Sequence, residues 1–174
     1  VGVVKPQVAF FERFGADGYR ALEAVLAAAR SAGLLVIADA KRGDIGTTVE
    51  AYGQAWLTPG SPLEADALTA VAYQGLGSLD AVIALAEQGE KGLFLLTATS
   101  NPEAVSTQQA VRADGRTVAS GLLSDIRARR SGSLGVVVGA TVDAADYGIA
   151  LPDLVGVPIL APGFGAQGAQ LSRV

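Results

Sequence analysis

Residues 33–48 read GLLVIADAKRGDIGTT, an apolar run that passes directly into a cluster of charged side chains. The apolar part, 33–38, predicts a buried strand, and a charge that follows such a strand is costly to bury unless it is paired or functional. Asp39 and Lys41 stand two residues apart, so on a strand their side chains point to the same side. Two interpretations fit: a structural ion pair at a solvated strand end, or a lysine held between the carboxylates of Asp39 and Asp44 as a proton donor.

Composition restricts the classes of protein that need to be considered. The chain has 174 residues, 50% of them hydrophobic and 17% charged, which indicates one folded domain rather than a disordered segment. The net charge of −4 argues against a nucleic-acid partner. The chain contains no histidine and no cysteine, which argues against zinc, iron–sulfur and Ser-His-Asp chemistry. No long apolar run predicts a membrane span or an export signal, so we expect a cytoplasmic protein.

Apolar runs that predict strands alternate with helical patterns along the whole chain. The strands are expected to begin near residues 1, 34, 67, 92, 134 and 157, and the main helices to cover about 17–32, 48–56, 79–88 and 118–129. Nearly continuous apolar strands that alternate with helices predict a parallel sheet covered by helices. Two architectures have this order, a doubly wound open sheet and a (β/α)8 barrel.

Polar residues at the strand ends favour the barrel. They follow several different strands: Lys5, Asp39, Lys41, Ser100, Thr141 and Gln167. A barrel gathers such residues in a ring at its C-terminal face, whereas an open sheet gathers only those near one switch point. We therefore predict a (β/α)8 TIM barrel with six of its eight strands apparent, because a full barrel takes about 250 residues. Residues 1–174 are expected to form a single barrel domain that is incomplete at both ends and inactive as an isolated segment.

Five ordered blocks of sequence resemble one enzyme family. They are VVKPQVAFFE (3–12), ADAKRGDIGTT (38–48), LLTATSNPE (95–103), GVVVGAT (135–141) and LAPGFGAQG (160–168). The chain is similar in these blocks to the orotidine 5′-phosphate decarboxylases, specifically to the longer bacterial (type 2) branch. The resemblance implies a (β/α)8 barrel that forms a homodimer with shared active sites. It also implies decarboxylation of orotidine 5′-phosphate (OMP) to UMP and CO2 in pyrimidine biosynthesis, without a metal or an organic cofactor.

The same resemblance assigns the catalytic roles. Lys41 would stabilise and protonate the carbanion left at C6 of the pyrimidine, and Asp39 would hold Lys41 in place as a cation. Lys5 would join the same charge network. Asp44 would reach into the site of the neighbouring subunit. Such a cofactor-free site works through electrostatics and positioning alone.

The substrate-binding residues are implied in the same way. Thr48 would act across the dimer, and Ser100 would hydrogen-bond the pyrimidine edge. Gly165 and Gln167 would belong to the loop that grips the phosphate, and Pro162 begins that segment. From spacing alone, Ser100 fits a helix cap beside a proline equally well, and the glycine-rich segment fits an ordinary turn.

The chain also departs from the family pattern, and two alternatives stay open. The family's first-strand aspartate and eighth-strand arginine have no counterpart here, and residues 71–74, VAYQ, differ from the usual motif. One alternative is a Mg²⁺-dependent keto-sugar-phosphate decarboxylase or synthase, which shares D-x-K-x-x-D but needs an acidic metal ligand where this chain has Lys5-Pro6. The other alternative is a non-catalytic barrel that binds a phosphate ligand.

Overall fold

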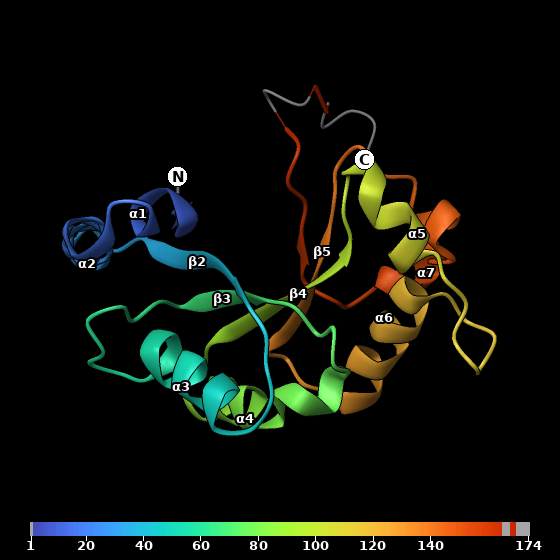
Figure 1. Ribbon diagram of the computed structural model, residues 1–174, viewed down its shortest axis with the longest axis horizontal. Coiled ribbons are helices and arrows are strands. Elements are labelled where there is room, and N and C mark those ends of the chain that lie inside the picture. Colours follow the sequence, from blue (N-terminus) through green and yellow to red (C-terminus); the bar gives the residue numbers. More distant parts are fainter. Residues whose placement is uncertain (1, 165–167, 170–174) are drawn as a thin grey trace. The chain divides into compact units, whose positions relative to one another are not determined.

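The computed structural model describes residues 2–164, 168 and 169 of the chain (Figure 1). These residues form two compact units, and the boundary between Leu93 and Phe94 falls inside a strand. That strand therefore contributes its first residues to one unit and its remaining residues to the other.

In the first unit, short strands alternate with helices. The strands are β1 (Val3–Val4), β2 (Leu35–Arg42), β3 (Ala67–Ala70) and the beginning of β4 (Gly92–Ala98). The helices are α1 (Ala9–Glu12), α2 (Gly15–Ser31), α3 (Gly46–Leu57) and α4 (Asp80–Gln88), and the 3₁₀-helix η1 (Leu76–Leu79) leads into α4. β1 pairs in parallel with β2, and β2 pairs in parallel with β3.

Helix α2 shows how the sequence produces these elements. Its buried residues, Gly18, Leu22, Leu26 and Ala29, recur every three or four positions and so line one face of the helix. The helix ends at Ser31, and Gly33 then adopts a φ of +69°. Glycine takes this left-handed conformation without steric cost, which lets the chain turn from the helix into β2.

Strand β2 is longer than the sequence predicted. The apolar run predicted a strand over 34–38, but the strand continues to Arg42 and includes the charged residues that follow the run. Its register against β3 shifts between Ala38 and Arg42, and Lys41 has a φ of +51°. A bulge of this kind bends a strand and redirects its side chains, and here it lies at the carboxyl end of β2.

The second unit contains the rest of β4, then β5 (Leu134–Val138) and β6 (Ile159–Leu160). Its helices are α5 (Val105–Gln108), α6 (Val118–Arg129) and α7 (Leu151–Leu154), with the 3₁₀-helices η2 (Pro102–Ala104) and η3 (Ala144–Tyr147). β5 pairs in parallel with β6. Helix α6 has the predicted bounds because its first turn is capped by Thr117, whose hydroxyl accepts from the Ser120 N–H at 3.0 Å, and its arginine-rich end stops at a left-handed Arg130.

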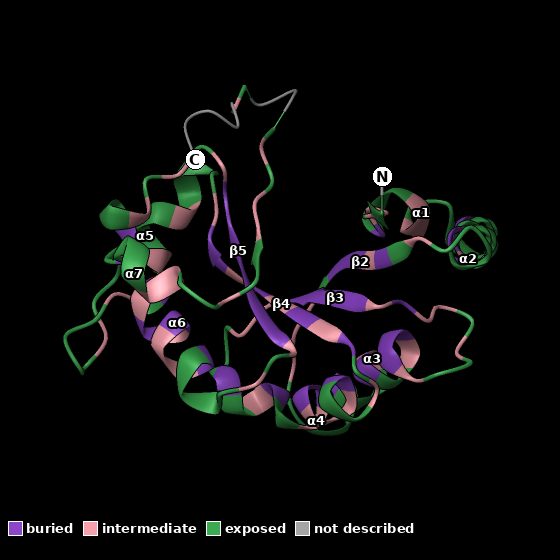
Figure 2. Cartoon of the chain, turned by 180° about the vertical axis from the view of Figure 1, so that it is seen from behind, coloured by how far each residue is buried: buried purple, intermediate pink, exposed green. Residues whose placement is uncertain are grey.

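The strands provide the core of each unit. All four residues of β3 and all five of β5 are buried, whereas the helices have mixed buried and exposed faces (Figure 2). Strands that are buried on both faces are typical of parallel sheets covered by helices. In the first unit α3 and α4 pack against each other beside β3 (Figure 1), and Trp56 of α3 is 2% exposed. The predicted alternation of strands and helices is confirmed.

Candidate active site

The centre of the site is the carboxylate of Asp39, which is buried on β2. Its Oδ2 lies 2.5 Å from the Lys5 ammonium, and its Oδ1 lies 2.5 Å from the Lys41 ammonium. The hydroxyl of Thr69 on β3 also donates to Oδ1, at 2.9 Å. The structure therefore brings together three of the predicted catalytic residues, Lys5, Asp39 and Lys41.

Backbone pairing between neighbouring segments holds this cluster in place. The N–H of Asp39 donates to the carbonyl of Pro6 at 3.1 Å, and the N–H of Val8 donates to the carbonyl of Asp39 at 3.2 Å. These bonds extend the pairing of β1 with β2 past the end of β1, where Lys5 stands. Lys5 and Asp39, 34 residues apart in sequence, meet because they lie on adjacent parallel segments.

The cluster contains more positive than negative charge. Two ammonium groups surround one carboxylate, so the three side chains carry a net charge of +1. Burial by itself raises the pKa of the Asp39 carboxyl, but hydrogen bonds from Lys41, Lys5 and Thr69 outweigh it and hold that pKa below its ordinary value of 3.8. Asp39 is therefore ionised at neutral pH. The lysine side chains are 31% and 43% exposed, so both cations face solvent and can meet an anionic ligand.

Two polar residues of the cluster were not predicted from the sequence. Gln7 accepts a hydrogen bond from the Lys41 ammonium at 3.3 Å through its side-chain oxygen. Thr69 contacts both Asp39 and the backbone of Lys41. Thr69 did carry a signal, because it is the one polar residue in the apolar run of β3, ALTA. Gln7 carried none, since its role depends on the pairing of segments far apart in the chain.

Asp44 and Thr48 lie outside this hydrogen-bonded cluster. Asp44 accepts from the N–H of the next residue, Ile45, at 2.9 Å. Thr48 is exposed in the first turn of α3. In the described part of the chain, no hydrogen bond joins either residue to Asp39 or Lys41. Their predicted role across a dimer stays a prediction.

The predicted substrate-binding residues of the second unit lie in loops that follow strands. Ser100 is exposed just after β4, and its neighbour Thr99 is held on two sides: its N–H donates to Gln108 at 2.9 Å, and its carbonyl accepts from the Tyr147 hydroxyl at 3.3 Å. Pro162 follows β6, and its carbonyl accepts from the N–H of Ala140 at 2.8 Å. Gly165 and Gln167 lie outside the described residues.

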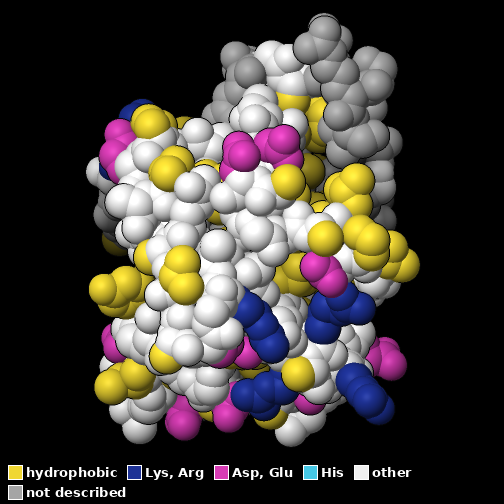
Figure 3. All heavy atoms as spheres, turned by 90° about the vertical axis from the view of Figure 1, so that its right-hand side faces the viewer, with side chains coloured by type: hydrophobic (Ala, Val, Ile, Leu, Met, Phe, Trp, Pro, Cys, Tyr) yellow, Lys and Arg dark blue, Asp and Glu magenta, His cyan; other side chains and the backbone are white. Residues whose placement is uncertain are grey.

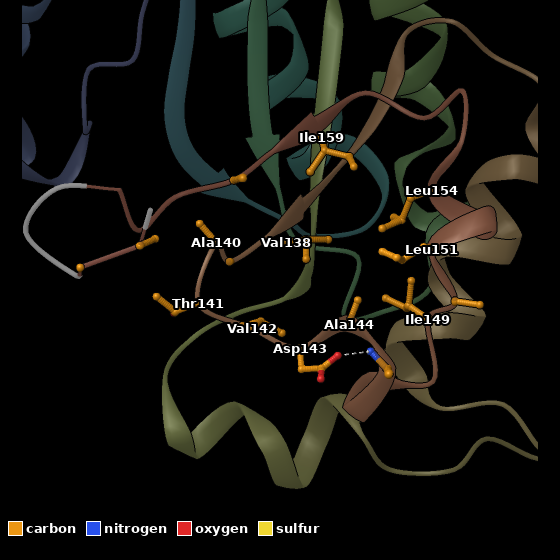
Figure 4. A pocket seen from close by; sticks show the side chains of 16 residues that line it. Val138, Ala140, Thr141, Val142, Asp143, Ala144, Ile149, Leu151, Leu154 and Ile159 are labelled. Atoms are coloured by element: carbon orange, nitrogen blue, oxygen red, sulfur yellow. Dashed lines mark hydrogen bonds between the residues drawn. The ribbon is translucent and has the colours of Figure 1, made fainter. Parts of the chain in front are cut away.

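The second unit also contains a hollow of about 750 Å³ beside β5 and β6 (Figure 4). Apolar side chains from β6, α7 and the segment before α7 form one wall, among them Ile149, Leu151, Leu154 and Ile159. The loop after β5 forms another wall, where Thr141 lies and where Asp143 accepts from the N–H of Ala145 at 3.0 Å. The lining includes no lysine or arginine. The described part of this hollow therefore lacks the cations that bind a phosphate.

Residues 2–164, 168 and 169 contain no group of three or more acidic, histidine or cysteine side chains placed to hold a metal ion. In the same residues, no helix is both long and apolar enough to cross a lipid bilayer.

Basic and acidic side chains lie interspersed on the face shown in Figure 3. Arginines of the second unit are paired in this manner, Arg112 with Asp125 at 2.9 Å and Arg127 with Asp153 at 3.1 Å.

Comparison with known proteins gives a consistent result. Residues 1–172 match the model of the "Orotidine 5′-phosphate decarboxylase / HUMPS" family. An orotidine 5′-phosphate decarboxylase of Salinispora tropica is 50% identical over 174 residues, and one of Streptomyces coelicolor is 49% identical over 175 residues. Each alignment covers 97% of this chain and 62% of the relative. The chain thus spans less than two thirds of the length of these relatives.

Solved structures give the same fold. A crystal structure from Streptomyces avermitilis, provisionally named an orotidine 5′-phosphate decarboxylase, is 50% identical with a TM-score of 0.90, and the match covers 98% of this chain and 60% of that one. The OMP decarboxylase of Leishmania donovani is 34% identical with a TM-score of 0.78 over 91% of this chain and 61% of that one. The predicted (β/α)8-barrel class is confirmed.

Proposed function

The chain belongs to the orotidine 5′-phosphate decarboxylase / HUMPS family, and on that basis we propose that the protein is a carbon–carbon lyase that converts OMP to UMP and CO2 in pyrimidine biosynthesis. The observation that carries the proposal is the Lys5–Asp39–Lys41 cluster, in which a buried carboxylate fixes two partly exposed ammonium groups at 2.5 Å. The curated relatives that align over 97% of the chain are named for this reaction.

The cluster suits the chemistry of this reaction. Loss of CO2 from C6 of the pyrimidine leaves a carbanion in the ring, and a fixed cation beside that carbon stabilises the developing charge. Lys41 is the cation in our proposal, and its ammonium then donates a proton to C6. Asp39 holds Lys41 by an ion pair and places a negative charge near the departing carboxylate. Lys5 pairs with Oδ2 of Asp39, the oxygen that Lys41 leaves free, so that the three side chains keep a net charge of +1.

The remaining site residues complete the proposal. Ser100 and Pro162, in loops after β4 and β6, would contact the pyrimidine, and Gly165 and Gln167 would belong to the phosphate-binding loop. Asp44 and Thr48 would serve the site of a second subunit in a homodimer. Their surroundings support that role, because Ile45, which lies between them, is 60% exposed. We further propose that the enzyme acts in the cytoplasm and needs no cofactor.

A Mg²⁺-dependent reaction on a keto-sugar phosphate is the second candidate. The matching family is described as "Orotidine 5′-phosphate decarboxylase / HUMPS", so it is not limited to the OMP decarboxylases. The position of Lys5 opposes it. A divalent cation at Asp39 would have to displace or repel an ammonium group that lies 2.5 Å from the carboxylate. The two candidates differ in their response to chelation: decarboxylation of OMP should persist in EDTA, whereas a Mg²⁺-dependent reaction should stop.

The direct test measures OMP consumption and CO2 release with the full-length protein and with its Lys41→Ala and Lys41→Arg variants. Because a positioned acid contributes about 100- to 10,000-fold, both variants should lose at least about 100-fold in kcat; arginine keeps the charge but donates its proton poorly. Arg20→Ala is the control, since Arg20 pairs with Asp17 on an exposed helix face. Nucleotide binding without CO2 release by the wild type would instead support a non-catalytic barrel.

A further inference from the structure

The hydroxyl of Thr69 connects the two residues on which the proposed reaction depends. Thr69 is 1% exposed in β3. The backbone N–H of Lys41 lies 3.0 Å from Thr69 Oγ1, and Asp39 Oδ1 lies 2.9 Å from the same atom. A backbone N–H can only donate, so Oγ1 accepts from Lys41, and the single hydroxyl proton is free to point at the carboxylate. Both hydrogen bonds therefore have a fixed direction.

Thr69 also lies at the point where the two strands lose their regular register. Ala38 is paired with Leu68 and Arg42 with Ala70, so the residues between Ala38 and Arg42 are opposite Thr69 alone. Within that segment Lys41 adopts a φ of +51°, which non-glycine residues rarely take. Its N–H is bonded to a side-chain hydroxyl, and this bond supports the unusual backbone conformation at Lys41.

One hydroxyl thus controls two properties of the site. Through the Lys41 N–H it supports the bulge that directs the lysine side chain, and through Oδ1 it sets the orientation of the Asp39 carboxylate. The Lys41 ammonium lies 2.5 Å from that same oxygen. We propose that Thr69 is a positioning residue, which fixes the direction of the Lys41 ammonium and its Asp39 partner while making no contact with the substrate. This inference rests on the proposed decarboxylase function.

A positioning role and a merely structural role make different predictions. If Thr69 only fills the core, valine should replace it well, because valine has the same branched shape. If the hydroxyl positions the site, Thr69→Val should leave the fold intact, leave the Lys41 N–H without its partner, and reduce the rate of the chemical step. A misplacement of about 1 Å in such a site costs on the order of 100-fold.

The chain offers a matched control in Thr97. Thr97 is also 1% exposed and lies on the next strand, β4, but its hydroxyl donates to the carbonyl of Leu95 at 2.9 Å rather than to a site residue. Thr97→Val therefore removes a buried strand hydroxyl without touching Asp39 or Lys41. Thr69→Ser provides the opposite control, because it keeps the hydroxyl and removes only a methyl group.

The experiment measures kcat and KM for OMP in the full-length protein. We expect Thr69→Val to lower kcat about tenfold or more with KM within about threefold, and Thr69→Ser and Thr97→Val to stay within about threefold of the wild type in both values. A Thr69→Val enzyme with wild-type kcat overturns the proposal, and so does an equal loss in Thr97→Val. Should Thr69→Val not fold, Thr69→Ala and Thr69→Ser give the same comparison, since they differ only in the hydroxyl.

Two measurements by NMR do not depend on turnover. In Thr69→Val the amide of Lys41 should exchange its hydrogen with solvent at least about tenfold faster, because the bond to Oγ1 is lost. The titration midpoint of the Asp39 carboxyl should also move upward, since one of its donors is gone. A wild-type protein without decarboxylase activity would refute the proposed function, yet these two measurements would still decide whether Thr69 fixes Asp39 and Lys41. Unchanged exchange and an unchanged midpoint overturn the proposal.

Discussion

The ammonium of Lys41 lies 2.5 Å from Oδ1 of Asp39, two residues earlier on the same strand. Side chains at this spacing share one face of a regular strand, but their Cα atoms are about 7 Å apart. The left-handed backbone at Lys41, with φ +51°, and the register shift of β2 against β3 alter this geometry. The ion pair thus forms inside the bulge of β2, where Lys41 follows Asp39 by two residues.

Replacing Asp39 by asparagine should impair both activity and stability. The change leaves the ammonium groups of Lys5 and Lys41 close together without their shared counter-ion, so Lys41 should move away from the reacting carbon. We expect kcat to fall about 100-fold or more and the free energy of unfolding to fall by about 1–3 kcal/mol, less than for a fully buried pair because both lysines are partly solvated. Enzyme assays and urea denaturation measure the two effects. Asp17→Asn, on an exposed face of α2, should change neither value, and a wild-type kcat in Asp39→Asn would contradict the assignment.

The same carboxyl should shape the response to acid. Burial raises the pKa of Asp39, but the hydrogen bonds from Lys41, Lys5 and Thr69 lower it below 3.8, so the folded protein binds fewer protons here than the unfolded one. The resulting stabilisation is complete above the ordinary pKa and is lost as pH falls through the lower, folded-state pKa. Urea unfolding between pH 7 and pH 2 should therefore show a shallower acid-side loss of stability in Asp39→Asn than in the wild type. Identical acid slopes in the two proteins would show that Asp39 is not linked to folding in this way.

A second cluster should contribute to stability without affecting the chemistry. The guanidinium of Arg42 pairs with Glu12 and lies 5.5 Å from the ring centre of Tyr52, and the Tyr19 hydroxyl donates to Glu12 at 2.8 Å. Lysine in place of Arg42 cannot make the same planar contacts. Arg42→Lys should lower the free energy of unfolding by about 0.5–1 kcal/mol, measured in urea, with kcat within about twofold. Arg20→Lys, on an exposed surface, is the control. A loss of kcat well beyond twofold in Arg42→Lys would place Arg42 in the reaction.

The proposed dimer can be tested at Ile45. This side chain is 60% exposed between Asp44 and Thr48, the two residues that are expected to act in the partner's site. A charged residue in an apolar interface is costly to desolvate, so Ile45→Lys should shift the full-length protein toward monomer in sedimentation experiments and lower its activity in parallel. Val111→Lys makes the same substitution at a side chain that is 72% exposed in the second unit and should leave the oligomeric state unchanged. A monomeric wild type would remove the proposed roles of Asp44 and Thr48.

The sequence was sufficient to predict the order of the elements, and it contained the three charged residues that the structure brings together. Helix 118–129 was predicted with its observed bounds, and the structure shows Thr117 capping its first turn and Arg127 and Arg129 in its last turn. Strand β2 was predicted too short, since hydrophobicity marks only the apolar run, whereas the strand continues through charges that find partners on neighbouring segments. Asp39 and Lys41 drew attention because charges after a buried strand need a partner or a function, whereas their catalytic roles and that of Lys5 were implied by the family resemblance.

Other parts of the site could not be predicted from local patterns. Gln7 contacts Lys41 across 34 residues of sequence, and Thr69 contacts Asp39 across 30. Both contacts depend on the register between adjacent strands and on the bulge at Lys41, neither of which leaves a mark within a short window of sequence. Thr69 stands in a run of apolar residues, where threonine is also an ordinary strand former. Its polarity marks it within that run, but its role becomes visible only when its two partners are known.

The loop that carries Ser100 packs against a buried glycine. Gly139, just after β5, is buried, and its N–H donates to the carbonyl of Ala98 at 2.8 Å. A Cβ atom at Gly139 would lie 3.3 Å from both the backbone nitrogen and the Cβ of Ser100 and 3.0 Å from a methyl group of Val142. Gly139→Ala should therefore displace Ser100 by a few tenths of an ångström, the shift that relieves such a contact.

Because Ser100 is proposed to bind the pyrimidine rather than to take part in proton transfer, the main effect should be on substrate affinity. We expect Gly139→Ala to raise KM for OMP about three- to tenfold, equivalent to about 1 kcal/mol of lost binding, with a smaller change in kcat. Gly132→Ala is the matched control, since no atom lies within 4 Å of a Cβ built there and its backbone needs no left-handed conformation. A change confined to kcat would indicate that the loop after β4 acts on the chemical step. An unchanged KM would indicate that Ser100 does not bind the substrate.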